Sequence, residues 1–129
     1  MITIYGELYS SKNSKQIVKL GDKPALISSK VFRTNIKPIE QQLMLNRGKW
    51  FEEIDFVPKP LRIVFRIYRK THRRFDYVNI VQGLLDAMVK CRWIPDDNAD
   101  IVLPVFYPYD VDKKNPRVEI WVDKLLTKG

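Results

Sequence analysis

Apolar and polar residues alternate along several short segments of the chain, and this period of two is typical of half-buried β-strands. Residues 2–8 alternate in this way, and residues 61–68 place aliphatic side chains and Phe65 on one face and two arginines on the other. Further strands are predicted at residues 16–20, 25–28, 101–106 and 117–122. The first two of these flank a Gly-Asp-Lys-Pro sequence that predicts a hairpin turn. Pro104 predicts that its strand lies at a sheet edge or contains a bulge.

A helical period of apolar positions runs through residues 29–46 and residues 78–90. Pro38 predicts a kink or a first turn in the first helix, and Gly48 is expected to end it. The second helix has two opposite stripes, an apolar one of Val81, Leu84, Leu85 and Met88 and a polar one of Asn79, Gln82, Gly83, Asp86 and Lys90. Because strands and helices mix without strict alternation, we expect a single α+β domain over residues 1–129, a mixed sheet with two main helices packed on it.

Composition removes several kinds of site from consideration. The 129 residues include one cysteine and one histidine, which excludes an internal disulfide and a Cys/His zinc site. No segment approaches the roughly 18 apolar residues that a membrane-spanning helix needs, so no membrane partner is expected. The first residues lack the basic and apolar regions of a signal peptide, which favours a cytoplasmic protein. Catalysis would therefore depend on carboxylates, amides and basic groups.

The net charge of +8 is distributed unevenly along the chain. Residues 56–75 hold seven basic residues and His72 but no acid, whereas aspartates gather later in the sequence. A basic surface followed by an acidic cluster is typical of a metal-dependent nuclease, in which basic groups track phosphates and carboxylates hold the metal. Two other interpretations remain open at this point: a solvated basic face without a ligand, and a basic RNA- or ribosome-associated domain.

Residues 73–98 contain the candidate chemistry. Asp76 stands where the N-cap of the second helix is expected, Asn79 and Asp86 follow on its polar stripe, and Asp97 comes after a short connector. Their oxygens are hard ligands of the kind that Mg²⁺ prefers, so we expect Asp76, Asp86 and Asp97 to converge on one ion. The alternative is structural, with Asp76 only a cap, Asp86 only solvated and Asp97 only part of a turn.

The same segment resembles the RusA family of Holliday junction resolvases, small endodeoxyribonucleases of phage type. The resemblance rests on Arg73-Arg74-Phe75-Asp76-Tyr77-Val78-Asn79, Leu85-Asp86-Ala87-Met88 and Trp93-Ile94-Pro95-Asp96-Asp97-Asn98. Earlier in the chain, residues 11–15 resemble the polar Ser/Asn loop of the family, and Ser28-Ser29-Lys30 fits the segment before its long helix. These segments follow one another in the same order as in the family, and together they span most of the sequence.

The resemblance implies a Mg²⁺-dependent homodimer, with Mn²⁺ as an alternative ion, that binds four-way DNA junctions in recombination and repair and nicks opposing strands. It implies that Asp76 and Asp97 are catalytic and that Asp76, Asn79, Asp86 and Asp97 hold the metal. DNA would be bound by the basic residues Lys12, Lys15, Arg66, Arg69, Lys70, Arg73 and Arg74. For self-association we expect apolar strand residues near both ends of the chain, namely Ile4, Val118, Ile120 and Trp121.

Two positions depart from the family pattern. Val78 stands where a second aspartate is expected, and Gln82 stands where a lysine is expected. The first change removes a metal ligand, and the second removes a positive charge that would stabilise the transition state. Asn79 or Asp86 is a candidate to replace the ligand, and Lys90 is a candidate to supply the charge. The departures also predict an alternative function, a catalytically lapsed RusA-like protein that binds DNA without cutting it.

Overall fold

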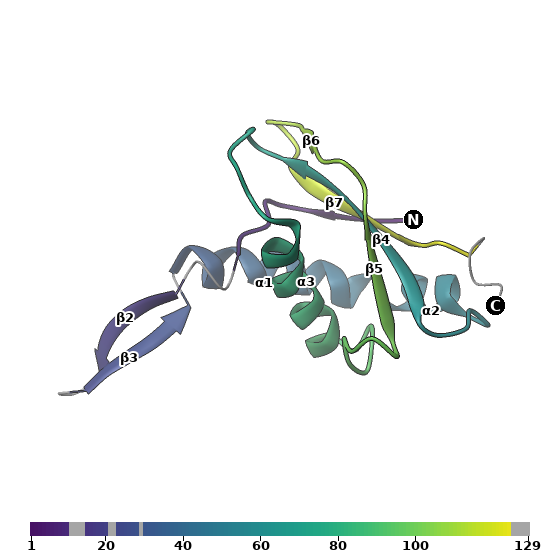
Figure 1. Ribbon diagram of the computed structural model, residues 1–129, viewed down its shortest axis with the longest axis horizontal. Helices are drawn as coiled ribbons and strands as arrows, with labels where there is room; N and C mark the ends of the chain where they lie inside the picture. Colours follow the sequence, from purple (N-terminus) through teal and green to yellow (C-terminus); the bar gives the residue numbers. More distant parts are fainter. Residues whose placement is uncertain (11–14, 21–22, 29, 125–129) are drawn as a thin grey trace.

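Strand β4 (Leu61–Arg69) lies in the interior of a mixed five-stranded sheet in the computed structural model, which describes residues 1–10, 15–20, 23–28 and 30–124 (Figure 1). The main strand order is β1 (Ile2–Tyr5), β7 (Arg117–Val122), β4 and β5 (Val102–Phe106). The short strand β6 (Asp110–Val111) continues the β5 side and pairs with the end of β4. Strands β1 and β4 run antiparallel to β7, whereas β5 and β6 run parallel to β4. Pro104 therefore lies in an edge strand, as its inability to donate a ladder hydrogen bond predicts.

Three helices complete the main body: α1 (Lys30–Leu45), α2 (Arg47–Ile54) and α3 (Tyr77–Lys90). The strand positions that alternate inward pack with these helices in one core, in which Ile63, Phe65, Leu43 and Met88 are all fully buried. Strands and helices that mix in this way confirm the predicted α+β class. None of the helices in the described ranges has the length and apolarity needed to cross a membrane.

The expectation that Gly48 ends the first helix is wrong. Helix α1 ends at Leu45, and after the single residue Asn46 the chain becomes helical again as α2, which contains Gly48. The fully buried side chain of Trp50 explains the second helix, because burial of a large aromatic group outweighs the modest helix penalty of one glycine. The described residues therefore form three helices, where the sequence predicted two main ones.

Gly83 is also placed differently from the expectation that it belongs to a polar stripe. It is buried, and a Cβ atom added to it would lie 3.1 Å from the Cε1 atom of Phe32. Glycine therefore serves here to let the backbone of α3 approach α1 closely. The apolar stripe of α3 is confirmed, since Val81, Leu84, Leu85 and Met88 are all buried.

Strands β2 (Lys15–Leu20) and β3 (Lys23–Ser28) form a separate two-stranded antiparallel sheet, which Figure 1 draws apart from the main sheet. Their register runs from Lys15 opposite Ser28 to Leu20 opposite Lys23. The two predicted strands are confirmed, but Lys23 and Pro24 belong to β3 and not to the turn. The other two residues of the predicted turn lie outside the described residues.

Candidate functional site

The basic segment between β4 and α3 is anchored at its start by a buried ion pair. Arg69, the last residue of β4, has its Nε atom 2.9 Å from Oε1 of Glu7, and only about a tenth of each side chain is exposed. The second carboxylate oxygen of Glu7 accepts a hydrogen bond of 2.8 Å from the backbone N–H of Lys70. One carboxylate after β1 therefore fixes both the end of β4 and the direction in which the basic segment leaves it.

Aromatic side chains hold the far end of this segment against the sheet. The Phe75 ring packs edge-on against Tyr77 and Tyr109, with centroids 5.1 and 4.9 Å away. Tyr77 in turn stacks on Phe106 of β5 at 5.3 Å, and its hydroxyl accepts a hydrogen bond of 2.8 Å from the backbone N–H of Tyr109. The start of α3 is thereby fixed relative to β5, and these rings serve packing more than they serve base stacking.

A cleft of about 210 Å³ opens between residues 8–10 and the first turn of α3. Its lining includes Arg69, Arg73 and Arg74 together with Asp76 and Asn79. Arg73 and Arg74 are exposed, and within the described part of the chain neither makes an ion pair. The structure thus brings three of the predicted DNA-binding residues to one place, beside two of the predicted metal ligands.

Asp76 is the N-cap residue of α3, as predicted, but its side chain makes no capping hydrogen bond. Its Oδ2 atom instead accepts a hydrogen bond of 3.2 Å from the side-chain amide of Asn79. The two predicted ligands at the mouth of the helix are therefore paired with each other, and both face the cleft.

Gln82 joins the other two predicted metal ligands. Its side-chain amide donates to Oδ1 of Asp86 at 3.0 Å and to Oδ2 of Asp97 at 3.3 Å. The helix and the connector therefore present carboxylates on either side of one amide group. The family pattern has a lysine at this position and does not predict the bridge, although the spacing of four residues between Gln82 and Asp86 is the helical spacing at which side chains meet.

The expected convergence of Asp76, Asp86 and Asp97 on one ion does not occur. Asp76 and Asp86 are ten positions apart, and a helix rises 1.5 Å per residue, so about 15 Å of helix separates them. Over the residues that the structure describes, no three His, Cys, Asp or Glu side chains are grouped so that they would hold a metal ion. The four predicted ligands form two separate pairs, Asp76 with Asn79 and Asp86 with Asp97.

Asp96, the partner in the Asp-Asp pair, serves the local turn. Its carboxylate accepts hydrogen bonds of 3.0 Å from the side-chain amide of Asn98 and 2.8 Å from the backbone N–H of Asp97. These bonds stabilise the charged form and hold the pKa of Asp96 below its usual value, with the Asn98 bond the larger cause. The turn leaves the neighbouring Asp97 side chain directed at Gln82.

Two stacked indoles hold the connector that carries this turn. The rings of Trp50 and Trp93 lie 4.7 Å apart at an interplanar angle of 15°, and both are buried. The indole N–H of Trp50 donates to the backbone carbonyl of Trp93 at 2.8 Å, and that of Trp93 donates to the carbonyl of Leu43 at 2.6 Å. The position of Asp97 therefore depends on packing between α1, α2 and the connector.

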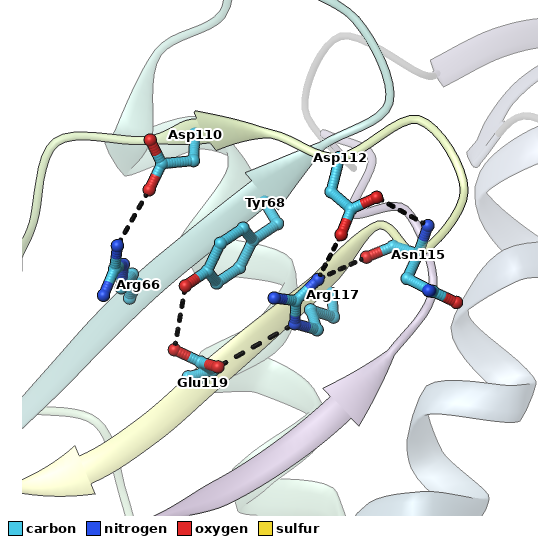
Figure 2. Close-up of polar contacts among 7 residues, drawn as sticks. All are labelled: Arg66, Tyr68, Asp110, Asp112, Asn115, Arg117 and Glu119. Atoms are coloured by element: carbon cyan, nitrogen blue, oxygen red, sulfur yellow. Dashed lines mark hydrogen bonds and ion pairs between the residues drawn. The ribbon is translucent and has the colours of Figure 1, made fainter.

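Two arginines on the outer face of the sheet are charge-paired, although β4 belongs to an acid-free stretch of sequence. Figure 2 shows Arg66 of β4 bonded to Asp110 at 3.0 Å and Arg117 of β7 bonded to Asp112 at 2.9 Å. The hydrogen bond from Arg66 is the main reason why the Arg66 pKa is raised, and the bond from Arg117 is the main reason why the Asp112 pKa is lowered. Both guanidinium groups also lie over the ring of Tyr68.

The predicted DNA-binding residues therefore divide into distinct groups. Arg66 and Arg69 are already ion-paired, whereas Arg73 and Arg74 are exposed in the cleft and Lys70 is exposed beside them. Lys15 is the first residue of β2. Lys12 lies outside the described residues.

Comparison of the chain with models of known protein families gives no match, and comparison with curated proteins gives none either. The resemblance to RusA resolvases therefore rests on the motif residues alone. The four metal ligands that the resemblance implies form the two pairs described above. The hydrogen bonds of Gln82 to Asp86 and Asp97 are not part of the family motif.

Proposed function

We propose that the protein is a RusA-like endodeoxyribonuclease that binds branched DNA and cuts it with the help of Mg²⁺. The observation that supports this best is the bridge from Gln82 to Asp86 and Asp97. It brings two carboxylates from separate parts of the chain to one point on the same helix that carries Asp76, at whose mouth the exposed arginines lie. Basic groups that hold phosphates beside clustered carboxylates are the arrangement that metal-dependent phosphodiester hydrolysis requires.

The residues around Gln82 fit a magnesium ion by the chemistry of their donor atoms. Mg²⁺ is usually bound through one or two carboxylates and keeps several waters, and Asp86 with Asp97 supplies such a pair. The amide of Gln82 would turn so that its oxygen, and not its nitrogen, faces the ion. When bound, the ion would polarise a phosphoryl oxygen and activate a water molecule. Asp76 and Asn79 would act at the mouth of the helix, beside the arginines that hold the DNA.

Cleavage of synthetic four-way junctions tests this function directly. We expect nicking that requires Mg²⁺ or Mn²⁺ and is lost in Asp86→Asn and in Asp97→Asn, which change the two carboxylates beside Gln82, while affinity for the junction is unchanged or slightly raised. Asp100→Asn is the matched control, because Asp100 is exposed, lies three residues after Asp97 and contributes only its backbone N–H to a hydrogen bond. If Asp100→Asn loses cleavage to the same extent as Asp97→Asn, the specific role proposed for Asp97 is wrong.

A second function is favoured by the same residues, namely junction binding without cleavage. A neutral amide, that of Gln82, donates to both Asp86 and Asp97 where the family has a lysine, and Val78 is exposed where the family has a carboxylate. If the protein binds four-way junctions tightly but remains inert with either metal, this lapsed form takes the place of the nuclease.

A homodimer remains part of the proposal, because paired nicks in a junction with near-twofold symmetry require two active sites. Three of the four residues expected at its interface are ruled out as surface groups, since Ile4, Val118 and Ile120 are fully buried in the core of the single chain. Only Trp121 keeps some exposure. Sedimentation with and without junction DNA would measure the assembly, and a monomer at micromolar concentration in both cases would exclude it.

A further inference from the structure

The guanidinium of Arg69 is buried and incompletely satisfied. About nine-tenths of the residue is shielded from solvent, and it lines the cleft at the start of α3. Within the described residues neither its Nε nor its Nη1 atom has a hydrogen-bond partner of good geometry, although Nε lies 2.9 Å from the Glu7 carboxylate. The Cζ atom of Arg69 lies 4.5 Å from the centroid of the Phe75 ring, which also lines the cleft. Buried charged donors are normally satisfied, so the Nη1 group is the donor of Arg69 that still lacks an acceptor among the described residues.

Other donors face the same cleft. Arg73 and Arg74 line it and remain without an ion pair among the described residues. The first turn of α3 lies at this cleft, and the backbone N–H groups of a first turn have no acceptors within their own helix. The side chain of Asp76, the N-cap residue, makes no capping hydrogen bond to them. The positive end of the helix dipole therefore adds to the arginine charges.

The charges in the cleft select the kind of anion. Three arginines (Arg69, Arg73 and Arg74) and one carboxylate (Asp76) line the cleft. Glu7 does not line it but is ion-paired with Arg69, so the group as a whole carries 3 − 2 = +1. An internal phosphodiester carries one negative charge, whereas a terminal phosphate monoester carries about −1.5 to −2 at neutral pH. The arginine fork also matches the oxygen geometry of a phosphate.

We propose that this cleft binds a single internal phosphodiester of the DNA backbone, with Arg69 as the buried donor and Arg73 and Arg74 as the outer clamp. This deepens the function proposed above and rests on it for the identity of the nucleic acid. Glu7 holds Arg69 in place, and it also limits the charge so that a singly charged phosphate is preferred.

The test replaces single phosphates of an immobile four-way junction by neutral methylphosphonates, one position at a time, and measures the dissociation constant by fluorescence anisotropy. For the wild-type protein we expect one position near the branch point at which neutralisation weakens binding about tenfold, as loss of a charge-assisted hydrogen bond does. In Arg69→Lys, which keeps the charge but loses the fork, the same neutralisation should cost less than about twofold. Arg66→Lys is the matched control on the same strand, because it makes the same replacement at an arginine that is paired with Asp110 outside the cleft, and in it the neutralisation should still weaken binding about tenfold.

A second measurement needs no variant of a buried residue. Inorganic phosphate added to the wild-type protein should shift the Nε–Hε NMR signal of Arg69 and the amide signals of the first turn of α3. A cleft that is silent to phosphate, or a methylphosphonate profile that is the same in Arg69→Lys and wild type, would overturn the proposal. A 5′-phosphorylated end that competes about tenfold better than an unphosphorylated one would overturn the assignment to an internal phosphodiester.

These outcomes separate the cleft from the nuclease. Metal-dependent junction cleavage with no effect of Arg69 would refute the phosphate site and leave the proposed function intact. An Arg69-dependent response to phosphate in a protein that neither prefers junctions over duplex DNA nor cuts them would refute the function and leave the phosphate site intact.

Discussion

Replacing Trp93 by phenylalanine tests whether the connector that carries Asp97 is held by the indole pair. The ring of Trp93 stacks on Trp50 at 4.7 Å, and its N–H donates a hydrogen bond of 2.6 Å to the carbonyl of Leu43 at the end of α1. Both indoles are fully buried. Phenylalanine keeps an aromatic ring in the stack but removes the donor and part of the volume.

The expected loss of stability follows from these two changes. A buried Leu43 carbonyl that loses its partner costs about 1–3 kcal/mol. The smaller ring leaves a cavity that costs about 1 kcal/mol more. The sum of about 2–4 kcal/mol is large against the roughly 5–15 kcal/mol by which a domain of this size is stable.

Urea unfolding followed by circular dichroism measures this loss. Trp121→Phe is the matched control, because Trp121 is only half-buried, packs edge-on against Tyr107 at 5.3 Å and lies on the outer face of the sheet. We expect the control to lose less than about 1 kcal/mol. The side-chain amide NMR signals of Gln82 should move in Trp93→Phe and stay in Trp121→Phe. Equal unfolding midpoints for the two variants would refute the reasoning.

Three further predictions concern charge. Replacing Arg73 and Arg74 with alanine should flatten the log–log salt dependence of DNA affinity by about one to two units, and an unchanged slope would remove this loop from the interface. The double variant Val78→Asp with Gln82→Lys should cleave junctions faster with Mg²⁺, because it adds a carboxylate at residue 78 and a positive charge at residue 82, one helical turn later. A cleavage rate equal to that of the parent protein would contradict this prediction. The arginine hydrogen bond lowers the folded-state pKa of Asp112, so its stabilisation is present above the unfolded value of about 3.9 and is lost as pH falls through the lowered pKa. Urea midpoints between about pH 5 and pH 2 should therefore fall less steeply in Asp112→Asn than in the wild type, and parallel profiles would argue against this effect.

The strands and the main helices could be predicted because their signals are local. Alternation places Ile63 and Phe65 on one face of β4, and the helical stripe of α3 places Leu84 and Met88 toward them, so burial follows from sequence period alone. The failure at Gly48 has the opposite cause. Trp50 is drawn into a stack with a residue 43 positions later, and no local pattern contains that contact.

In the candidate site too, local spacing could be predicted from the sequence, whereas contacts between distant residues could not. The sequence places Asp76, Asn79 and Asp86 on one predicted helix. With a rise of 1.5 Å per residue, that helix already separates Asp76 from Asp86 by about 15 Å, which is too far for the two carboxylates to share an ion. The position of Asp97 depends on the turn at Asp96 and on the buried indoles. Gln82 showed only a departure from a family pattern, whereas in the fold its amide holds two carboxylates.

The basic stretch that begins in β4 changes character at Arg69, and under the proposed function this favours the mouth of α3 as the side that DNA would contact. Before this residue, Arg66 is neutralised by an acid that lies 44 positions later in sequence but beside it in the sheet. After it, Arg73 and Arg74 are exposed at the cleft, so the mouth of α3 offers two adjacent arginines without an ion pair among the described residues.

A DNA strand held at that mouth would run along α3 toward Gln82 and its two carboxylates. Between Asp76 and the Gln82–Asp86 turn the helix rises about 9–15 Å. This distance is larger than the 3.4 Å axial rise per nucleotide of one strand, so the phosphate held in the cleft and the bond cut beside Asp97 should belong to different nucleotides. Mapping the nick on the same junctions that carry the methylphosphonates measures this distance. A nick at the neutralised position itself would mean that the arginines and the metal ligands act on one phosphate, which two sites at opposite ends of this helix segment do not allow.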